Sequence, residues 1–487
     1  MKYALGIDFG GGSSKATLID ENGNIVATAS EEYETVSTVD GGREQDPDAW
    51  VKAAVDNIKK ATTGVKVDPR DVVSLCFDAA THTAVLMDEN FRLVRPSVYW
   101  TDTRSVAEKE YLKREYGEEI FNKFKHEVDT IWTLPELLWI KNKKPEIFAK
   151  VNKICFAKDY VRRFFTDDFV TDDIEAEGSM LFDFDRRQWD KKFLSILGLS
   201  EENLPEVVRP DKIAGYVTEK AAAATGLKVG IPVICGTTDT AMEVFAAGAV
   251  EKGQATLKLA TAGRICVVSD KLIPDKNLIN YSHVISGLYY PGTATKSCAA
   301  SLRWFRDTFG GDYAGFGTEA AKIPVGSEGL IFHPYLSGEL TPYGNPKLKG
   351  SFVGISSTHT KAHFARAVME GVAMSLLDCK SYLETRGVKP TSAFALGGGA
   401  KSAVWRQIVA DALDIELITT EDNDSSFGSA MFAGINAGFF KDEKDALIKC
   451  RKVTGKTAPI AENTVKYAEM FKKYKKIQQV LQEIYND

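Results

Sequence analysis

The chain has 487 residues, 44% of them apolar and 26% charged, and a formal net charge of −6. This composition is that of a globular protein and excludes a fibre or a disordered chain. A single hydrophobic core stops growing near ~250–300 residues, so the length predicts two domains. The mild negative charge disfavours binding to a nucleic acid backbone, and we expect no nucleic acid partner.

The seven cysteines are scattered and form no C-x-x-C pair, which argues against a disulfide framework and against a zinc site. We expect them to be small core residues. The first apolar stretch is interrupted by Asp8, unlike that of a signal peptide. No window approaches the ~20 apolar residues of a membrane span. We therefore expect a cytoplasmic protein without a membrane partner.

The chain opens with short apolar stretches that predict a meander of strands. Residues 3–7 and 15–19 are the first two, and a glycine-rich turn at residues 10–12 joins them. A turn with a glycine leads into a third strand from residue 25 onward.

A helix and a further strand follow. Asp46 and Pro47 are typical of the N-cap and the first residue of a helix. Residues 72–77 are short and apolar, which predicts a buried strand. The succession of sheet, helix and strand indicates an α/β fold.

A second cycle of the same kind begins near the middle of the chain. Residues 232–235 predict a strand, and a turn and a helix over residues 240–247 follow. Strands at 255–260 and 264–269 then flank a polar turn with a glycine, as at the N-terminus. This repetition predicts an internal duplication, with the domain junction at residues 248–253.

The last third of the chain is dominated by helical periodicity. Residues 362–384 and 402–413 predict helices, with a strand at 394–396 before the second. The C-terminal stretch is amphipathic, and we expect it to pack back on the body of the protein. The apolar residues near one face of this stretch are Tyr467, Met470, Phe471, Tyr474, Leu481 and Ile484.

Polar or glycine-rich turns follow four predicted strands. They comprise residues 8–14, 261–263 and 397–400, and the turn that holds Asp239. Ligands of α/β sheets collect where strands end, and glycines let backbone amides approach phosphate oxygens. Neither a G-x-x-x-x-G-K-[ST] loop nor a G-x-G-x-x-G fingerprint is present. The four turns together favour a nucleotide held between two domains.

Two carboxylates in these turns are candidates for chemistry. Asp8 would hold Mg²⁺ through water, and the alternative is an aspartate that bonds its own turn. Thr240 and Glu243 fit a capping box, which leaves Asp239 available as the general base for a hydroxyl. The alternative for Asp239 is the N-cap itself.

Two polar groups follow other short strands and suit a sugar. His82 lies beyond the strand at 72–77 and would donate to a hydroxyl; the alternative is a structural histidine. Trp100, Asp102 and Arg104 combine an aromatic wall with fixed polar groups, as a sugar site needs. The alternative for this second group is a cluster at the interdomain surface.

Several segments resemble the FGGY family of carbohydrate kinases, most closely its xylulokinase members, over nearly the whole chain. The most specific are residues 350–355 and 363–370, which match the family's C-terminal signature, and the glycine turn and helix at 396–407. The resemblance implies two actin-like domains (ribonuclease H-like, ASKHA) with a cleft for nucleotide and sugar between them. Residues 1–248 would be the sugar-binding domain and 249–487 the nucleotide-binding domain.

The resemblance also implies roles for single residues, with ATP and Mg²⁺ as cofactors. Asp239 corresponds to the catalytic base and, with Asp8, to the residues at the metal. Substrate binding falls to Thr81, His82, Trp100, Asp102 and Asp239. Nucleotide binding falls to Gly10, Gly11, Gly12, Ser13, Lys15, Thr261, Gly263, Arg303, Gly398, Gly399, Ala400 and Ser402.

The chain departs from the family pattern at a few of these positions. Gly11 and Gly12 stand where a hydroxyl residue is usual, Thr81 replaces a methionine, and Glu136 replaces a lysine. The expected reaction is phosphorylation of D-xylulose to D-xylulose 5-phosphate, with D-ribulose, L-xylulose and gluconate as open alternatives. A non-catalytic sugar and nucleotide sensor is the rival function. A homodimer is expected by analogy alone.

Overall fold

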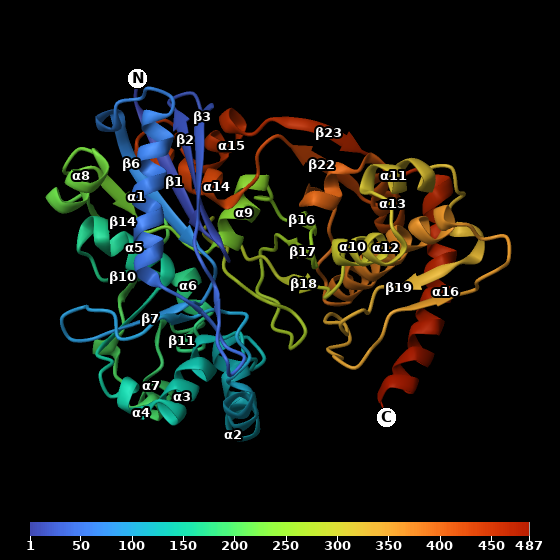
Figure 1. Ribbon diagram of the computed structural model, residues 1–487, viewed down its shortest axis with the longest axis horizontal. Helices are drawn as coiled ribbons and strands as arrows, with labels where there is room; N and C mark the ends of the chain where they lie inside the picture. The colour runs from blue at the N-terminus through green and yellow to red at the C-terminus, as the bar shows by residue number, and fades with distance from the viewer. Residues whose placement is uncertain (487) are drawn as a thin grey trace. The chain divides into compact units, whose positions relative to one another are not determined.

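The computed structural model describes residues 1–486, and its internal contacts divide the chain into two compact units (Figure 1). The first unit comprises Met1–Ala246, Tyr281–Ser286 and Asp422–Arg451. The second comprises Ala247–Asn280, Gly287–Glu421 and the chain from Lys452 on. This division differs from a single cut at residue 248, because two later segments return to the first unit.

The first unit is built on a six-stranded sheet with the order β14-β15-β6-β1-β2-β3. The meander expected at the N-terminus is antiparallel, and β6 and β15 add to β1 in parallel. The predicted strands are confirmed, but β1 and β6 each extend two residues further and take in an aspartate. The bounds are β1 Tyr3–Phe9, β2 Ser13–Asp20, β3 Ile25–Glu32, β6 Val72–Ala79, β14 Ile213–Tyr216 and β15 Pro232–Ile234.

The second unit repeats this sheet. Its order is β18-β17-β16-β21-β22-β23, again with an antiparallel meander beside parallel strands. The internal duplication predicted from the sequence is thus present in the pairing of the strands. The bounds are β16 Gln254–Leu259, β17 Gly263–Val267, β18 Gly292–Ala294, β21 Ser392–Leu396, β22 Glu416–Thr420 and β23 Val453–Thr457.

Two helices cover the sheet of the first unit. Helix α1 (Pro47–Thr63) packs on β2 and β3, and its N-cap is Asp46, whose side chain accepts from the amide of Asp48 at 3.0 Å, as predicted. Helix α14 (Ser425–Asn436) packs on β1 and β6, although it follows the strands of the second unit in sequence. The close approach of α14 requires a glycine in β1, since a Cβ at Gly6 would lie 2.1 Å from the Ala430 nitrogen.

The other helices of the first unit surround the sheet and its insertions. They are α2 Val106–Phe124, α3 Thr133–Lys143, α4 Pro145–Phe148, α5 Ala157–Thr166, α6 Asp173–Glu177, α7 Lys191–Leu197, α8 Glu219–Thr225, α9 Asp239–Ala247 and α15 Glu443–Cys450. The short strands of this unit are β4 Val36–Ser37, β5 Arg43–Gln45, β7 Ala84–Met87, β8 Ser97–Val98, β9 Lys153–Phe156, β10 Val170–Asp172, β11 Phe182–Asp183, β12 Gln188–Trp189 and β13 Glu206–Val208.

The helices of the second unit enclose a core formed with the inner face of its sheet. The helices predicted at 362–384 and 402–413 are confirmed as α12 and α13. The bounds are α10 Ala299–Phe309, α11 Tyr313–Ala320, α12 Lys361–Thr385, α13 Ala403–Leu413 and α16 Ala461–Asn486, with strands β19 Ile331–His333 and β20 Ser351–Val353.

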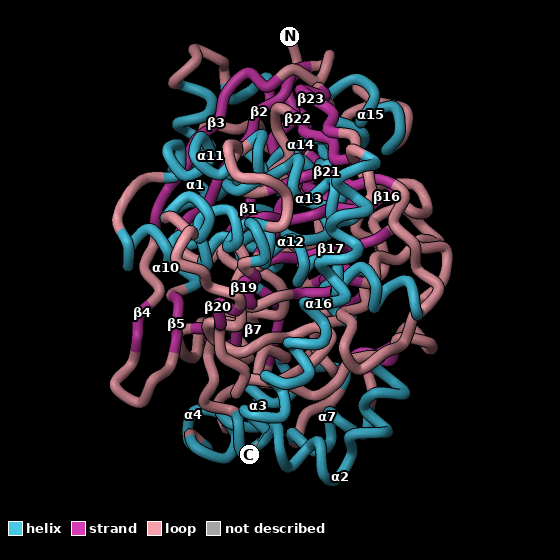
Figure 2. The backbone as a smooth tube through the Cα atoms, turned by 90° about the vertical axis from the view of Figure 1, so that its right-hand side faces the viewer, coloured by secondary structure: helices cyan, strands magenta, loops and turns pink. Residues whose placement is uncertain are grey.

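The C-terminal helix packs back on the second unit, as expected. Figure 2 shows α16 as one long helix, and it buries Tyr467, Met470 and Tyr474 against the core. Ile484 does not share this face, because its side chain is 58% exposed. In the last turn of the helix the core contact is made by Tyr485 instead.

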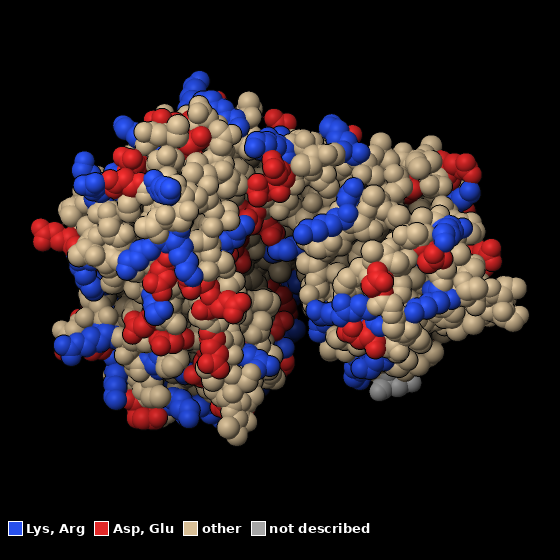
Figure 3. Space-filling model, turned by 45° about the horizontal axis from the view of Figure 1, so that its top comes forward, with Lys and Arg blue, Asp and Glu red and all other residues tan. Residues whose placement is uncertain are grey.

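The positions of the cysteines and of the charged side chains agree with a globular protein. All seven cysteines are buried, as expected. On the face shown in Figure 3, basic and acidic side chains are interspersed. None of the helices within residues 1–486 combines the length and the apolar character needed to cross a membrane.

The close approach of α14 to β1 gives a stability prediction. Gly6→Ala should lower the free energy of unfolding by about 3 kcal/mol, because the new methyl group meets backbone atoms of α14 that cannot move aside. Denaturant unfolding measures the effect. Gly117→Ala is the matched control, since the nearest atom to a Cβ in this α2 position is 3.8 Å away. Equal losses in the two variants would contradict the packing argument.

Candidate active site

Three aspartates meet at the carboxyl edge of the first unit's sheet. Asp8 and Asp78 lie directly opposite each other on the parallel strands β1 and β6. Asp239 follows β15, and the preceding Thr238 forms a parallel bridge to Ala79 at the end of β6. The ends of neighbouring parallel strands share one edge, which is why residues far apart in sequence come together here.

Burial and mutual repulsion keep a proton on the Asp8 and Asp78 pair. Desolvation raises the pKa of Asp8 to about 7, and the negative charges of Asp239 and Asp424 add to the rise. Desolvation and the charge of Asp8 hold the pKa of Asp78 well above its usual range. One oxygen of each carboxyl group, Oδ1, is buried without a hydrogen-bond partner.

This pair is suited to a partly hydrated Mg²⁺. Within residues 1–486 no group of three His, Cys, Asp or Glu side chains is arranged as a complete metal site. Mg²⁺ is usually held by one or two carboxylates and takes its other ligands from water and phosphate oxygens. The unpartnered oxygens of Asp8 and Asp78 fit that requirement.

Asp239 is the first residue of helix α9, not the residue before it. The cap is Thr238, whose Oγ1 accepts from the Ala241 amide at 3.3 Å, so the predicted capping by Thr240 is wrong. The helix begins one residue earlier because Thr238 places its hydroxyl over the first turn. Oδ1 of Asp239 accepts from the amide of Thr240 at 2.5 Å. The carboxylate therefore lies at the positive end of the helix dipole, which stabilises its charge.

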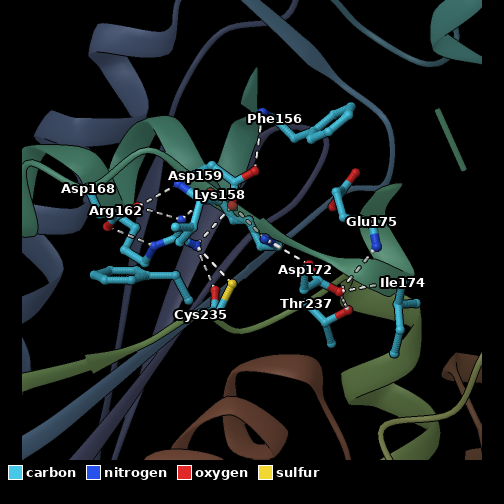
Figure 4. Close-up of polar contacts among 12 residues, drawn as sticks. Phe156, Lys158, Asp159, Arg162, Asp168, Asp172, Ile174, Glu175, Cys235 and Thr237 are labelled. Carbon is cyan, nitrogen blue, oxygen red and sulfur yellow. Dashed lines mark hydrogen bonds and ion pairs between the residues drawn. The ribbon is translucent and has the colours of Figure 1, made fainter. Parts of the chain in front are cut away.

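A buried ionic network supports the turn that carries Asp239 (Figure 4). The ammonium of Lys158 lies 2.5 Å from Oδ1 of Asp159 and 2.8 Å from Oδ2 of Asp172. Asp172 in turn accepts from Oγ1 of Thr237 at 2.6 Å. Because Lys158 and Asp172 are both fully buried, the network fixes Thr237 two residues before Asp239.

An arginine reinforces the same turn from the strand side. Nη1 of Arg162 donates to the carbonyl oxygen of Cys235 at 2.8 Å and pairs with Asp159 at 2.9 Å. The turn then starts at Gly236, where φ is +70° and a Cβ would lie 1.9 Å from the Phe77 carbonyl oxygen. The path of the chain from β15 to α9 is thus fixed on both sides.

His82 is buried in the first unit. Its amide donates to Oε1 of Glu175 at 2.6 Å, and its carbonyl oxygen accepts from Oγ1 of Thr133 at 2.9 Å. Burial holds the pKa of the imidazole well below its usual range, so the ring is neutral at physiological pH. Nε2 of His82 lies 2.5 Å from the hydroxyl of Tyr281.

Tyr281 belongs to a short strap, Tyr281–Ser286, whose flanking chain on both sides is part of the second unit. The strap is fastened to the first unit at two further points. Glu177 accepts from the amide of Ser282 at 2.8 Å, and Arg209 donates to the carbonyl oxygen of Val284 at 2.7 Å. A residue from the C-terminal half of the chain is thereby fixed against His82.

The glycine turn between β1 and β2 directs its carbonyls into the protein. The carbonyl oxygen of Gly10 accepts from Tyr33, that of Gly11 from Gln45, and that of Gly12 from the Tyr33 amide. The amides of Gly11 and Gly12 have no acceptor among the described residues. Such a turn suits an anion.

Two of the predicted site residues, Thr81 and Lys15, already have partners within the protein. Thr81 has its hydroxyl 3.5 Å from Oδ1 of Asp239. Lys15 forms an ion pair with Asp424, the N-cap of α14, and both side chains are partly exposed.

Trp100, Asp102 and Arg104, predicted to form one sugar-binding group, have different surroundings in the structure. Asp102 is buried and accepts from the Arg43 amide at 2.7 Å and from Arg104, so its oxygens serve internal contacts. Arg104 lies over the ring of Trp139, 4.2 Å from its centroid. Trp100 is 42% exposed and packs beside Tyr99. Sugar binding by Trp100 and Asp102 remains a prediction.

The predicted nucleotide residues of the second unit lie at the corresponding edge of its sheet. The turn with Thr261 and Gly263 follows β16, and the turn at 397–402 follows the parallel strand β21. A Cβ at Gly399 would lie 2.9 Å from that of Leu259, so the second turn lies close against the end of β16. Gly398 is exposed, Ala400 is buried, and Ser402 caps α13. Arg303 is exposed on α10.

Sequence patterns could have revealed only one of the other site residues. Asp78 could have been found, because it follows an apolar strand in the same way as Asp8. Lys158, Asp172 and Glu175 carry no local signal, since polar residues in a helix or at its start are ordinary. Tyr281 lies about two hundred residues from its partner His82, so only the folded chain brings the two together.

Comparison with known sequences finds a family for both halves of the chain. Residues 3–246 match the N-terminal domain of the FGGY family of carbohydrate kinases, and residues 277–437 match its C-terminal domain. A xylulose kinase of Lactococcus lactis is 30% identical, with 99% of this chain and 98% of that protein covered. A gluconokinase of Bacillus subtilis is 28% identical, with 99% and 97% covered.

Comparison with solved structures agrees with the sequence. A xyloylose kinase from Brucella ovis superposes with a TM-score of 0.93 at 28% identity, covering 99% of this chain and 100% of that one. A gluconate kinase from Lactobacillus acidophilus has the same TM-score and identity, covering 100% and 99%. These proteins have actin-like α/β domains, so the predicted fold class is confirmed.

The buried network gives a first prediction for this site. Lys158→Met should lower the free energy of unfolding by ~3–5 kcal/mol, because the buried carboxylate of Asp172 loses its counter-charge and that of Asp159 keeps only Arg162. Denaturant unfolding again measures the loss. Lys52→Met is the control, since Lys52 pairs with Asp56 on the surface with 79% of its side chain exposed. A Lys158 variant as stable as the Lys52 variant would show that the network does not hold the turn.

The carboxyl pair gives a second prediction. The folded-state pKa of Asp8, about 7, is above its usual 3.8, so between these values the folded protein binds a proton that the unfolded chain has released. The contribution of Asp8 to the free energy of unfolding is therefore largest below about pH 4 and falls as the pH rises to about 7. Asp8→Asn should flatten this decline in urea titrations without Mg²⁺. Parallel pH profiles of the two proteins would contradict the assignment.

Proposed function

The chain belongs to the FGGY family of carbohydrate kinases, and we propose that it transfers the γ-phosphoryl group of ATP to a small ketose, D-xylulose, giving D-xylulose 5-phosphate. In this proposal residues 1–248 hold the sugar and residues 249–487 hold the nucleotide. The observation that carries it is the fixed carboxylate of Asp239 at the edge of the sheet, beside Asp8 and Asp78.

Asp239 acts as the general base. Its carboxylate accepts the proton of the primary sugar hydroxyl as the new bond from that oxygen to the γ-phosphorus forms and the bond to the β,γ-bridging oxygen breaks, releasing ADP. The Lys158–Asp172–Thr237 network keeps this carboxylate in place, which limits the reorganisation needed in the reaction. An oxygen that can accept a proton and cannot swing away is what this step requires.

The other predicted residues surround the phosphates in this proposal. Mg²⁺ would be held near Asp8 and Asp239 and would neutralise charge on the transferred group. The amides of Gly11 and Gly12, with Ser13 and Lys15, bind phosphate oxygens, since these amides have no acceptor inside the protein. Residues assigned to the nucleotide in the second unit are Thr261, Gly263, Arg303, Gly398, Gly399, Ala400 and Ser402.

The sugar contacts are assigned to Thr81, His82, Trp100 and Asp102. Nε2 of the neutral His82 imidazole faces Tyr281, and its Nδ1, which has no hydrogen-bond partner among the described residues, would bind a sugar hydroxyl. Gluconate is the second candidate substrate, because gluconate kinases are about as similar to this chain as xylulose kinases are.

A coupled assay of ADP release decides between these substrates. D-xylulose, D-ribulose, L-xylulose and gluconate are compared at equal concentrations with ATP and Mg²⁺. We expect the highest kcat/KM with D-xylulose. A higher kcat/KM with gluconate would make gluconate the substrate in place of the ketose. Binding of sugar without any ADP release would favour a sensor.

The role of Asp239 is tested by Asp239→Asn. This variant should fold and bind D-xylulose but lose ~10²–10⁴-fold in kcat, because the amide cannot accept the hydroxyl proton. Asp46→Asn is the control, since asparagine also caps a helix and Asp46 lies at the start of α1. Near-normal kcat in Asp239→Asn would remove the carboxylate from the mechanism.

A further inference from the structure

His82 belongs to a cluster of four rings in the first unit. His82 lies 4.9 Å from Trp132 and 5.8 Å from Tyr281, measured between ring centroids. His126, which follows helix α2, stacks on Trp132 at 4.4 Å and lies 5.4 Å from Tyr281. No role has been assigned above to His126.

His126 differs from the other histidines of the described chain in its hydrogen bonding. Its side chain is 1% exposed, and both ring nitrogens, Nδ1 and Nε2, are buried without a partner. His333 is equally buried, but its Nε2 lies 3.1 Å from the Tyr474 carbonyl oxygen and its Nδ1 3.2 Å from Oγ of Ser351. Buried polar atoms are nearly always paired, so the two nitrogens of His126 call for a partner from outside the chain.

The chemistry of that partner follows from the charge of the ring. Burial lowers the pKa of His126 to about 3, so the imidazole is neutral at physiological pH. A neutral imidazole has one donor and one acceptor, and a hydroxyl group matches both. Trp132 adds an apolar wall of the kind that small-molecule sites provide.

A carboxylate is a poor match for the same site. It accepts hydrogen bonds only, so it leaves the acceptor nitrogen of His126 unpaired. The two imidazoles carry no positive charge to offset the desolvation of an anion. The ring cluster is therefore better suited to an uncharged polyhydroxy compound than to a sugar acid.

We propose that His126 binds a sugar hydroxyl and, with His82, makes this pocket select an uncharged sugar over a sugar acid. The proposal rests on the function proposed above, a kinase for a small sugar, and adds a specificity residue to its pocket. His82 and His126 both contact Trp132 and Tyr281, which hold the two imidazoles in one ring cluster.

The test uses the full-length protein and two substitutions. His126→Phe keeps a flat ring on Trp132 but removes both nitrogens, whereas His126→Gln keeps a donor and an acceptor. Titration calorimetry without nucleotide gives the Kd for D-xylulose and for gluconate, and ADP release gives kcat and KM. His333→Phe is the matched control, because it removes a partnered imidazole from the second unit.

We expect His126→Phe to raise Kd and KM for D-xylulose by ~10-fold or more, with kcat changed less than about threefold. In His126→Gln, Kd and KM for D-xylulose should stay within about threefold of the values for the unsubstituted protein. His333→Phe should lose stability and leave Kd unchanged, while His126→Phe should unfold at the same denaturant concentration or higher. Gluconate should bind at least ~10-fold more weakly than D-xylulose.

The inference is overturned if His126→Phe leaves Kd within about twofold, if His126→Gln loses as much affinity as His126→Phe, or if gluconate binds as tightly as D-xylulose. If His126→Phe does not fold, His126→Ala is held to the same Kd criterion. Failure of the proposed function gives a different result: D-xylulose binding that depends on His126, with no ADP release. If Kd and KM stay unchanged in every His126 variant and ADP release is normal, the kinase stands and only the specificity role of His126 is removed.

Discussion

Lys158 and Asp172 form an ion pair that is fully removed from water, with their charged atoms 2.8 Å apart. Taking two such charges into the interior costs several kcal/mol each, and their attraction only partly offsets that cost. The pair becomes favourable through its further hydrogen bonds, to Asp159 on one side and to Thr237 on the other. Those bonds connect helix α5, strand β10 and the turn that begins α9.

Much of the first unit's site depends on this network. Asp172 also accepts from the amide of Glu175 at 3.1 Å, and Glu175 accepts from the amide of His82. The turn that carries Asp239 and the backbone of His82 are therefore linked by one continuous set of polar contacts.

The duplicated sheets explain where the functional residues lie. In each unit the parallel strands end at one edge, and the turns at that edge carry the aspartates of the first unit and the glycines of the second. The first unit is completed by segments from later in the chain: α14 covers β1, and the strap Tyr281–Ser286 brings Tyr281 to His82. The chain thus passes between the units more than once.

Local sequence patterns determined the α/β class, the strand meanders, the long helices and the turns with Asp8 and Asp239, because periodicity, capping and glycine act over a few residues. The folded chain alone decided the start of α9, the return of α14, the exposure of Ile484 and the partners of Asp102. It also alone joined His126, Trp132 and Tyr281 around His82. Contacts between residues far apart in sequence depend on how whole elements pack, and no short pattern encodes that packing.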